Sequence, residues 1–236
     1  MPIVAHRSRL IRHSIAVLFL FSALTGLDSV RVVGQNLPAP NSNIAEEQDY
    51  AFAHGLYKDG LFLIATEQFD KFIKKYPQSV RIQDAQFLRA DCLFQQEQFS
   101  AAAREFSIFV GQYPTSILSD NARFRLAETY SKLKRSRDAI ESYKSILDHP
   151  QHSSVAGEAA YWIGEIYLKE GDLTNALKYY ALSYEGFAGN KLQDYAAYSA
   201  AWANQKKGEF AKAAEWYRVV IDKFPQSLLA SSSRVK

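Results

Sequence analysis

The sequence predicts an all-α fold, a right-handed solenoid of five helix–turn–helix repeats with a period of 37 residues and a partial sixth repeat. An alanine recurs at that interval: Ala65, Ala102, Ala139, Ala176 and Ala213. Twelve positions before each alanine lies a small residue: Ala53, Ala90, Ala127, Gly164 and Ala201. Four positions after each alanine stands an aromatic residue: Phe69, Phe106, Tyr143, Tyr180 and Tyr217. A fixed period of this length is typical of stacked repeats, so we expect units at about 46–82, 83–119, 120–156, 157–193 and 194–227.

The first helix of each unit carries the small residue and, three positions earlier, a further aromatic. These five aromatics, which we call the aromatic ladder, are Tyr50, Phe87, Phe124, Tyr161 and Tyr198. A turn follows, marked by Gly60, Gly171 and Gly208 in three units. The second helix carries the alanine and the later aromatic. Small residues on both helices allow their backbones to approach closely, and the later aromatic packs beside that crossing.

Proline ends most units, because it cannot donate a helical hydrogen bond. It stands twelve positions after the alanine at Pro77, Pro114 and Pro225, and one position early at Pro150. The fourth unit has Gly186 and Gly189 instead. In the first, second and fifth units a serine follows two residues after the proline and is a candidate N-cap of the next helix: Ser79, Ser116 and Ser227.

These columns resemble the tetratricopeptide repeat (TPR), a helix–turn–helix unit of 34 residues with small, small and aromatic positions and a terminal proline. The resemblance covers residues 46–227. The period is three residues longer, and the early tryptophan is replaced by an aromatic one place later. With the runs FDKFIKKYPQS and FSIFVGQYPTS, these departures resemble the envelope subgroup that includes the lipoprotein BamD and Tol-Pal-associated periplasmic proteins. That resemblance implies partners in outer-membrane protein assembly, the Tol-Pal system or peptidoglycan machinery.

Residues 1–34 read as a secretory signal peptide. A basic segment with Arg7, Arg9 and Arg12 precedes an apolar run of eleven residues, 14–24, and cleavage after Gly34 would leave Gln35 as the new N-terminus. The alternative is an uncleaved anchor, for which the apolar run is short. Residues 35–45 (QNLPAPNSNIA) then form a flexible leader.

The net positive charge of the chain comes from residues 1–34, the predicted signal peptide. The whole chain is formally +3, and residues 1–34 alone carry four basic residues and one acidic residue. The remainder is therefore neutral and gives no support for nucleic-acid binding, which is not predicted, because such binding requires a basic patch on the folded domain. The single cysteine, Cys92, allows no internal disulfide and is expected to be a buried thiol. No cysteine directly follows the apolar run, so a lipid anchor is not predicted.

No catalytic or cofactor site is predicted, and we expect the protein not to be an enzyme. The chain contains no Gly-rich phosphate loop, HExxH motif or GxSxG motif. His149 and His152 form an H-x-x-H beside Asp148, but with no third ligand nearby we predict solvated loop histidines and no metal site.

Residues 228–236 align with the opening of a sixth unit. They would form a serine-containing cap or the point at which a longer protein continues.

The predicted interaction surface is the concave groove lined by the first helices. The candidate residues for binding a partner are Tyr50, His54, Asp91, Glu128, Glu165, Tyr198 and Trp202. The competing interpretation is that the aromatic ladder packs in the core, leaving Tyr50, Tyr198 and Trp202 partly exposed, and that the charged rows are solvated.

The sequence therefore predicts an exported, non-enzymatic scaffold in the periplasm or cell envelope, which binds a peptide or helix of another envelope protein. Secretion from the cell is a further alternative for its location. Two alternatives for its function are an accessory repeat domain of a larger envelope or secretion protein and a self-associating structural array.

Overall fold

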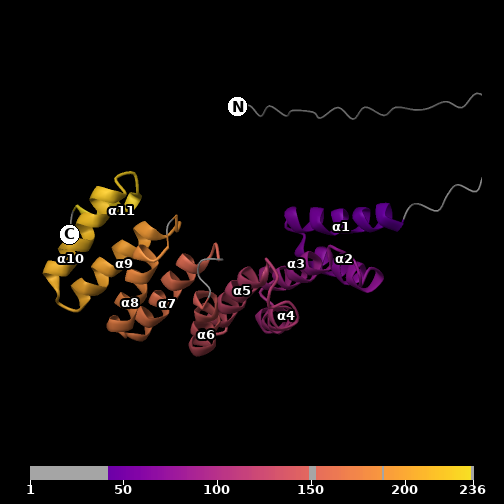
Figure 1. Cartoon of the computed structure of the whole chain (residues 1–236), viewed down its shortest axis with the longest axis horizontal. Helices are drawn as coiled ribbons and strands as arrows, with labels where there is room; N and C mark the ends of the chain where they lie inside the picture. Colours follow the sequence, from indigo (N-terminus) through magenta and orange to yellow (C-terminus); the bar gives the residue numbers. More distant parts are fainter. Residues whose placement is uncertain (1–41, 149–152, 188, 235–236) are drawn as a thin grey trace, which may run out of the picture. The chain divides into compact units, whose positions relative to one another are not determined.

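The computed structural model describes residues 42–148, 153–187 and 189–234, and over these residues the chain forms α-helices and no strand (Figure 1). The helices are α1 (Ser42–Lys58), α2 (Phe62–Lys75), α3 (Ile82–Gln95), α4 (Phe99–Gln112), α5 (Ser119–Lys132), α6 (Ser136–Leu147), α7 (Ala156–Glu170), α8 (Leu173–Glu185), α9 (Gln193–Lys206), α10 (Phe210–Lys223) and α11 (Leu228–Ser233). The predicted all-α solenoid is confirmed.

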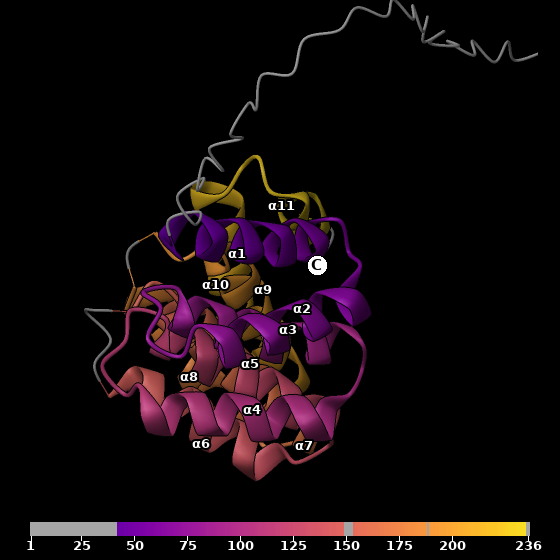
Figure 2. The ribbon, with the colours of Figure 1, turned by 90° about the vertical axis from the view of Figure 1, so that its right-hand side faces the viewer.

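Each helix packs against the next one in the chain, within a unit and between units (Figures 1 and 2). The odd-numbered helices are the first helices of their units, and several of these also contact each other directly: α1 with α3, α3 with α5, and α7 with α9. Contacts between neighbouring units alone are the pattern expected of a repeat array.

The ends of the array differ in part from the sequence-based boundaries. Helix α1 begins at Ser42, so the last four residues of the predicted leader 35–45 are helical. Residues 1–41, with the predicted signal peptide, and the H-x-x-H at 149–152 lie outside the described residues. At the other end, α11 packs on α9 and α10 in the register of a sixth first helix, with Ala230 and Ser233 buried.

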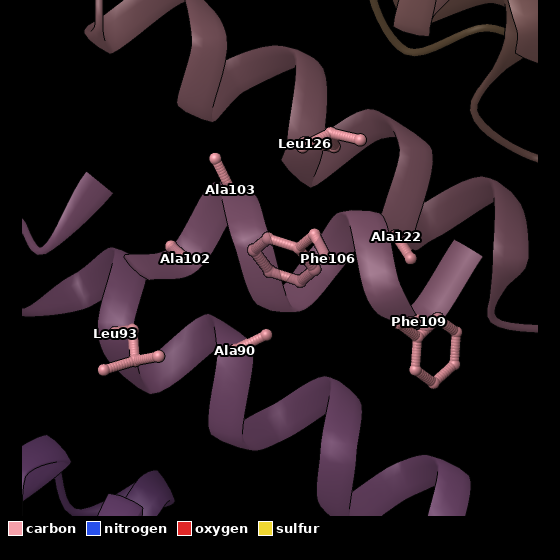
Figure 3. Packing of buried hydrophobic residues seen from close by; sticks show 8 residues of the cluster. All are labelled: Ala90, Leu93, Ala102, Ala103, Phe106, Phe109, Ala122 and Leu126. Carbon is pink, nitrogen blue, oxygen red and sulfur yellow. The ribbon is translucent and has the colours of Figure 1, made fainter. Parts of the chain in front are cut away.

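The core consists of the points where paired helices cross. The five repeating alanines and the aromatics that follow them are buried. The small residues of the first helices are buried as well. Figure 3 shows this arrangement in the second unit, where Phe106 lies between α3 and α5 beside Ala90, Ala102 and Ala122. Phe87 of the ladder meets Phe106 edge-on at 5.8 Å between ring centroids.

Steric contact explains why the fourth unit has glycine, Gly164, where the other units have alanine. A Cβ added to Gly164 would lie 2.6 Å from Cε1 of Tyr180, which is shorter than any ordinary contact. The missing side chain lets the Tyr180 ring cross α7 and donate a hydrogen bond from its hydroxyl to Glu165, at 2.8 Å.

In three units, a serine of the turn that follows the unit donates a hydrogen bond to the first helix of that unit. Ser116 donates to Gln83 at 2.6 Å, Ser227 donates to Asp194 at 2.6 Å, and Ser79 donates to Glu46. The same hydroxyls accept from the backbone N–H two residues on. Ser227 is the N-cap of α11, as predicted. Ser79 and Ser116 stand three residues before their helices, so they close the turn and do not cap the helix.

In the fourth unit an asparagine takes the place of this serine and makes different hydrogen bonds. Asn190 takes the serine position, and its side-chain oxygen accepts from the N–H of Leu192 at 3.0 Å. Its amide nitrogen donates to the backbone oxygen of Ser183 at 2.8 Å. The residue at the repeat position of the acceptors Glu46, Gln83 and Asp194 is Gly157 in this unit. A Cβ added to Gly157 would lie 2.5 Å from Cγ of Asn190. The larger Asn190 is therefore accommodated by the absence of a side chain opposite it.

Two glycine substitutions should separate packing from helix propensity. Alanine at either position gains up to about 1 kcal/mol of helix propensity, but Gly164→Ala also overpacks the Tyr180 contact, which typically costs about 1–3 kcal/mol. Gly55 in α1 has no atom within 4 Å of an added Cβ and is the matched control. By urea unfolding, we expect Gly164→Ala to be less stable than Gly55→Ala by about 1–3 kcal/mol. Equal stabilities would show that the ring does not occupy this notch.

Candidate interaction surface on the first helices

Side chains that reach from one first helix to the next lie along one side of these helices, which we call the first-helix face. In units one to three it comprises Tyr57, Asp91, Arg125 and Glu128. In units four and five it comprises Trp162, Glu165, Tyr195, Ser199 and Trp202. The contacts along it join residues 34 positions apart, such as Tyr57 with Asp91 and Glu165 with Ser199.

The aromatic ladder lies mostly against the second helices of its own units. Tyr50 meets Phe72 edge-on at 5.6 Å, and Tyr198 meets Tyr217 in the same way at 5.6 Å. Both keep partial exposure, whereas Tyr161 is buried. The ladder is therefore chiefly core packing, the competing interpretation of the sequence.

Asp91, which we expected on the exposed side of its helix, is 1% exposed and lies at the centre of a polar network. Its carboxylate accepts from the Tyr57 hydroxyl at 2.7 Å, and its other oxygen lies 2.9 Å from Nε of Arg125. Nη1 of Arg125 reaches Glu128 at 2.9 Å. The network thus links three consecutive units through α1, α3 and α5.

Burial changes the proton affinities of this network. The pKa of Tyr57 is raised by burial and by its hydrogen bond to Asp91. Burial also raises the pKa of Glu128, and the Arg125 charge only partly opposes that shift. Asp91 is almost fully buried and its carboxylate is held between Tyr57 and Arg125, so the network joins neighbouring units and does not present Asp91 to solvent.

The remaining polar candidates are also engaged within the array. His54 stacks between Tyr50 and Tyr57, with its ring centroid 5.7 and 6.5 Å from theirs. The pKa of His54 is lowered, chiefly by burial and to a lesser extent by the positive charge of Lys58. Glu165 accepts from Tyr180 at 2.8 Å and from Ser199 at 3.3 Å.

Units four and five present exposed aromatic rings on the same face. Trp162 of α7 is 40% exposed and Tyr195 of α9 is 48% exposed. Both lie against the buried ring of Tyr161, at 5.4 and 6.5 Å between centroids. Trp202 follows Tyr195 by seven residues, two turns along the same side of α9, and Lys206 lies 4.0 Å from its ring centroid. We call Trp162, Tyr195 and Trp202 the aromatic patch.

Trp202 was a sequence candidate, but Trp162 and Tyr195 were missed. Neither belongs to an aromatic column of the repeat. At the position of Trp162 the other units have Ala51, Leu88, Arg125 and Ser199, and at that of Tyr195 they have Glu47, Asp84, Asn121 and Glu158. The signal that could have found them is an aromatic at a position that is small, aliphatic or polar in every other unit.

Other features of the described residues do not suggest chemistry. They contain no group of three or more metal-ligating side chains placed to hold an ion. No helix among them is both long and apolar enough to cross a membrane. A cleft of about 250 Å³ opens between α2 and α4, but its Arg89 already pairs with Asp70 and, at 2.8 Å, with Glu105.

Comparison with known families finds the same repeat twice. The family model described as a tetratricopeptide repeat-like domain matches residues 63–193, and that of the tetratricopeptide repeat matches residues 195–227. A search of curated proteins finds no match.

Solved structures agree at low sequence identity. MamA is similar with a TM-score of 0.60 and 18% identity over 74% of this chain and 95% of MamA. A tetratricopeptide repeat protein from Parabacteroides merdae has a TM-score of 0.62 and 15% identity over 81% of this chain and 71% of its own. BtubC from P. vanneervenii has a TM-score of 0.63 and 14% identity over 82% and 84%, respectively. At these identities the likeness establishes the fold alone.

Removing the central acid should destabilise the array. Asp91→Ala leaves the Arg125 charge partly buried without its partner, and breaking a buried pair in this way costs about 3–5 kcal/mol. The measurement is chemical unfolding followed by circular dichroism. Because an apolar replacement of both partners is often neutral, the double variant Asp91→Leu with Arg125→Met should recover most of the loss. A change below about 0.5 kcal/mol in the single variant would contradict the network.

Proposed function

This chain belongs to the tetratricopeptide repeat family, and we propose that it is an exported scaffold that binds another protein of the cell envelope on its first-helix face. The family is generally a non-enzymatic scaffold for protein–protein interaction. The observation that carries the proposal is the aromatic patch. Exposed aromatic rings supply large contact area at low entropic cost and are common energetic centres of protein interfaces.

The division of the first-helix face supports this assignment. Asp91, Arg125 and Glu128 pair with one another, so on this face units one to three offer few free charged groups to a partner. Trp162 and Tyr195 are about half exposed although large apolar side chains are usually buried. A partner is therefore expected to be centred on α7 and α9.

The envelope location rests on the N-terminal sequence. Residues 1–34 have the basic segment, apolar run and cleavage position of a secretory signal. The resemblance to the envelope subgroup of TPR proteins supports partners in outer-membrane assembly, the Tol-Pal system or peptidoglycan machinery.

Partner binding can be tested by crosslinking and pull-down from the envelope fraction of the source organism. Trp162→Ala with Trp202→Ala should reduce recovery of the specific partner tenfold or more, because loss of one interface hot spot already costs about 2 kcal/mol. Leu63→Ala is the matched control, since Leu63 is 64% exposed on α2, away from this face. Equal recovery by the patch variant and the control would contradict the assignment.

Export has a separate test. The mature protein should be released with the periplasmic fraction and should begin at Gln35 on N-terminal sequencing, because cleavage is expected after Gly34. Recovery of the full-length chain in the membrane fraction would instead indicate an uncleaved anchor.

A further inference from the structure

The aromatic patch and the segment that precedes the array are chemically matched. The patch offers aromatic rings, and its neighbouring carboxylate Glu165 is already bonded to Tyr180 and Ser199. Lys206 lies over the ring of Trp202. A ligand of this patch needs flat apolar groups and no positive charge, because Lys206 already places a cation there.

Residues 35–41 (QNLPAPN) have that composition. They carry no charged side chain, and Pro38 and Pro40 are separated by a single residue. Proline fixes φ and favours the extended polyproline II conformation, which costs little entropy to order and docks on surfaces lined by aromatic side chains. These residues lie outside the described part of the chain, and they are the only Pro-x-Pro segment in the sequence.

The match cannot be made within one molecule. Pro38 stands four residues before Ser42, the first residue of α1, so it reaches at most about 14 Å from that helix. The patch on α7 and α9 is at least three first helices away, and packed helices lie about 8–10 Å apart, which gives a separation of roughly 25–30 Å. The segment must therefore come from another copy.

We propose that residues 35–41 of one copy bind the aromatic patch of a second copy. The prolines would stack on Trp162 and Tyr195, with Trp202 extending the surface along α9. The contact joins two different surfaces, so it is heterologous and can propagate into a ring or an open chain. This inference goes beyond the proposed function, since it assigns the patch a ligand within the same protein.

The first test is self-association of the mature chain by sedimentation velocity. Its weight-average mass should rise with concentration. Two variants should stay monomeric: Pro38→Gly with Pro40→Gly, which removes the ligand, and Trp162→Ala with Tyr195→Ala, which removes the site. Leu63→Ala should associate as the parent does. A monomeric parent at all concentrations, or an associating proline variant, would overturn the proposal.

Mixing the two defective variants gives a sharper result. The proline variant keeps an intact patch and the aromatic variant keeps an intact segment, so together they should form a one-to-one dimer and no larger species. A mixture that stays monomeric would overturn the proposal. A mixture that grows beyond the dimer would do so as well.

Direct binding can be followed with a synthetic peptide of residues 35–45. Two of the three tryptophans, Trp162 and Trp202, are in the patch, so binding to the proline variant should shift tryptophan emission. The dissociation constant should rise tenfold or more with Trp162→Ala, and a peptide with both prolines changed to glycine should not bind. An equal response to the glycine peptide would overturn the proposal. Loss of the envelope partner would not affect this assay, so failure of the proposed function remains distinguishable.

Discussion

The close crossing of two helices at a pair of small residues is the contact on which the rest of this structure depends. Where Ala102 of α4 meets Ala90 of α3, neither side chain holds the backbones apart, and Phe106 fills the space beside them. The same crossing recurs every 37 residues. Because it sets the spacing of the first helices, it brings residues 34 positions apart within hydrogen-bonding distance, as for Tyr57 and Asp91. In the fourth unit the alanine of the first helix is replaced by Gly164, because the ring of Tyr180 occupies the space that a Cβ would need.

The first-helix face built on this spacing has two parts with different chemistry. In the first three units the polar side chains Tyr57, Asp91, Arg125 and Glu128 bind one another across the first helices. Because the carboxylate of Asp91 is buried, removing one of its partners is expected to lower the free energy of unfolding. In the last two units the face carries the aromatic rings of Trp162 and Tyr195, which stay 40% and 48% exposed within the described residues. The buried polar network thus lies at one end of the face and the exposed aromatic rings at the other.

Much of the fold, and part of the candidate site, could be predicted from local patterns. The period and its columns predicted the helix pairs and the buried alanines, because the same pattern of small and aromatic residues recurs in five units. Single positions were harder. Asp91 and Glu165 share a column that looks like a charged row, and only the positions of Tyr57, Tyr180 and Ser199 turn them inward. Trp162 and Tyr195 were missed because a search for columns discards residues that occur once.

The sequence by itself determined the repeat, the helices and the identity of the residues that pack between them, since these follow from spacing along one chain. The sequence also predicts an export signal before the array, and residues 35–236 carry no net formal charge. Only the tertiary structure decided which first-helix side chains are free, because burial depends on neighbours 33 or 34 residues away. Those neighbours bury Asp91 inside the array and leave Trp162 and Tyr195 partly exposed.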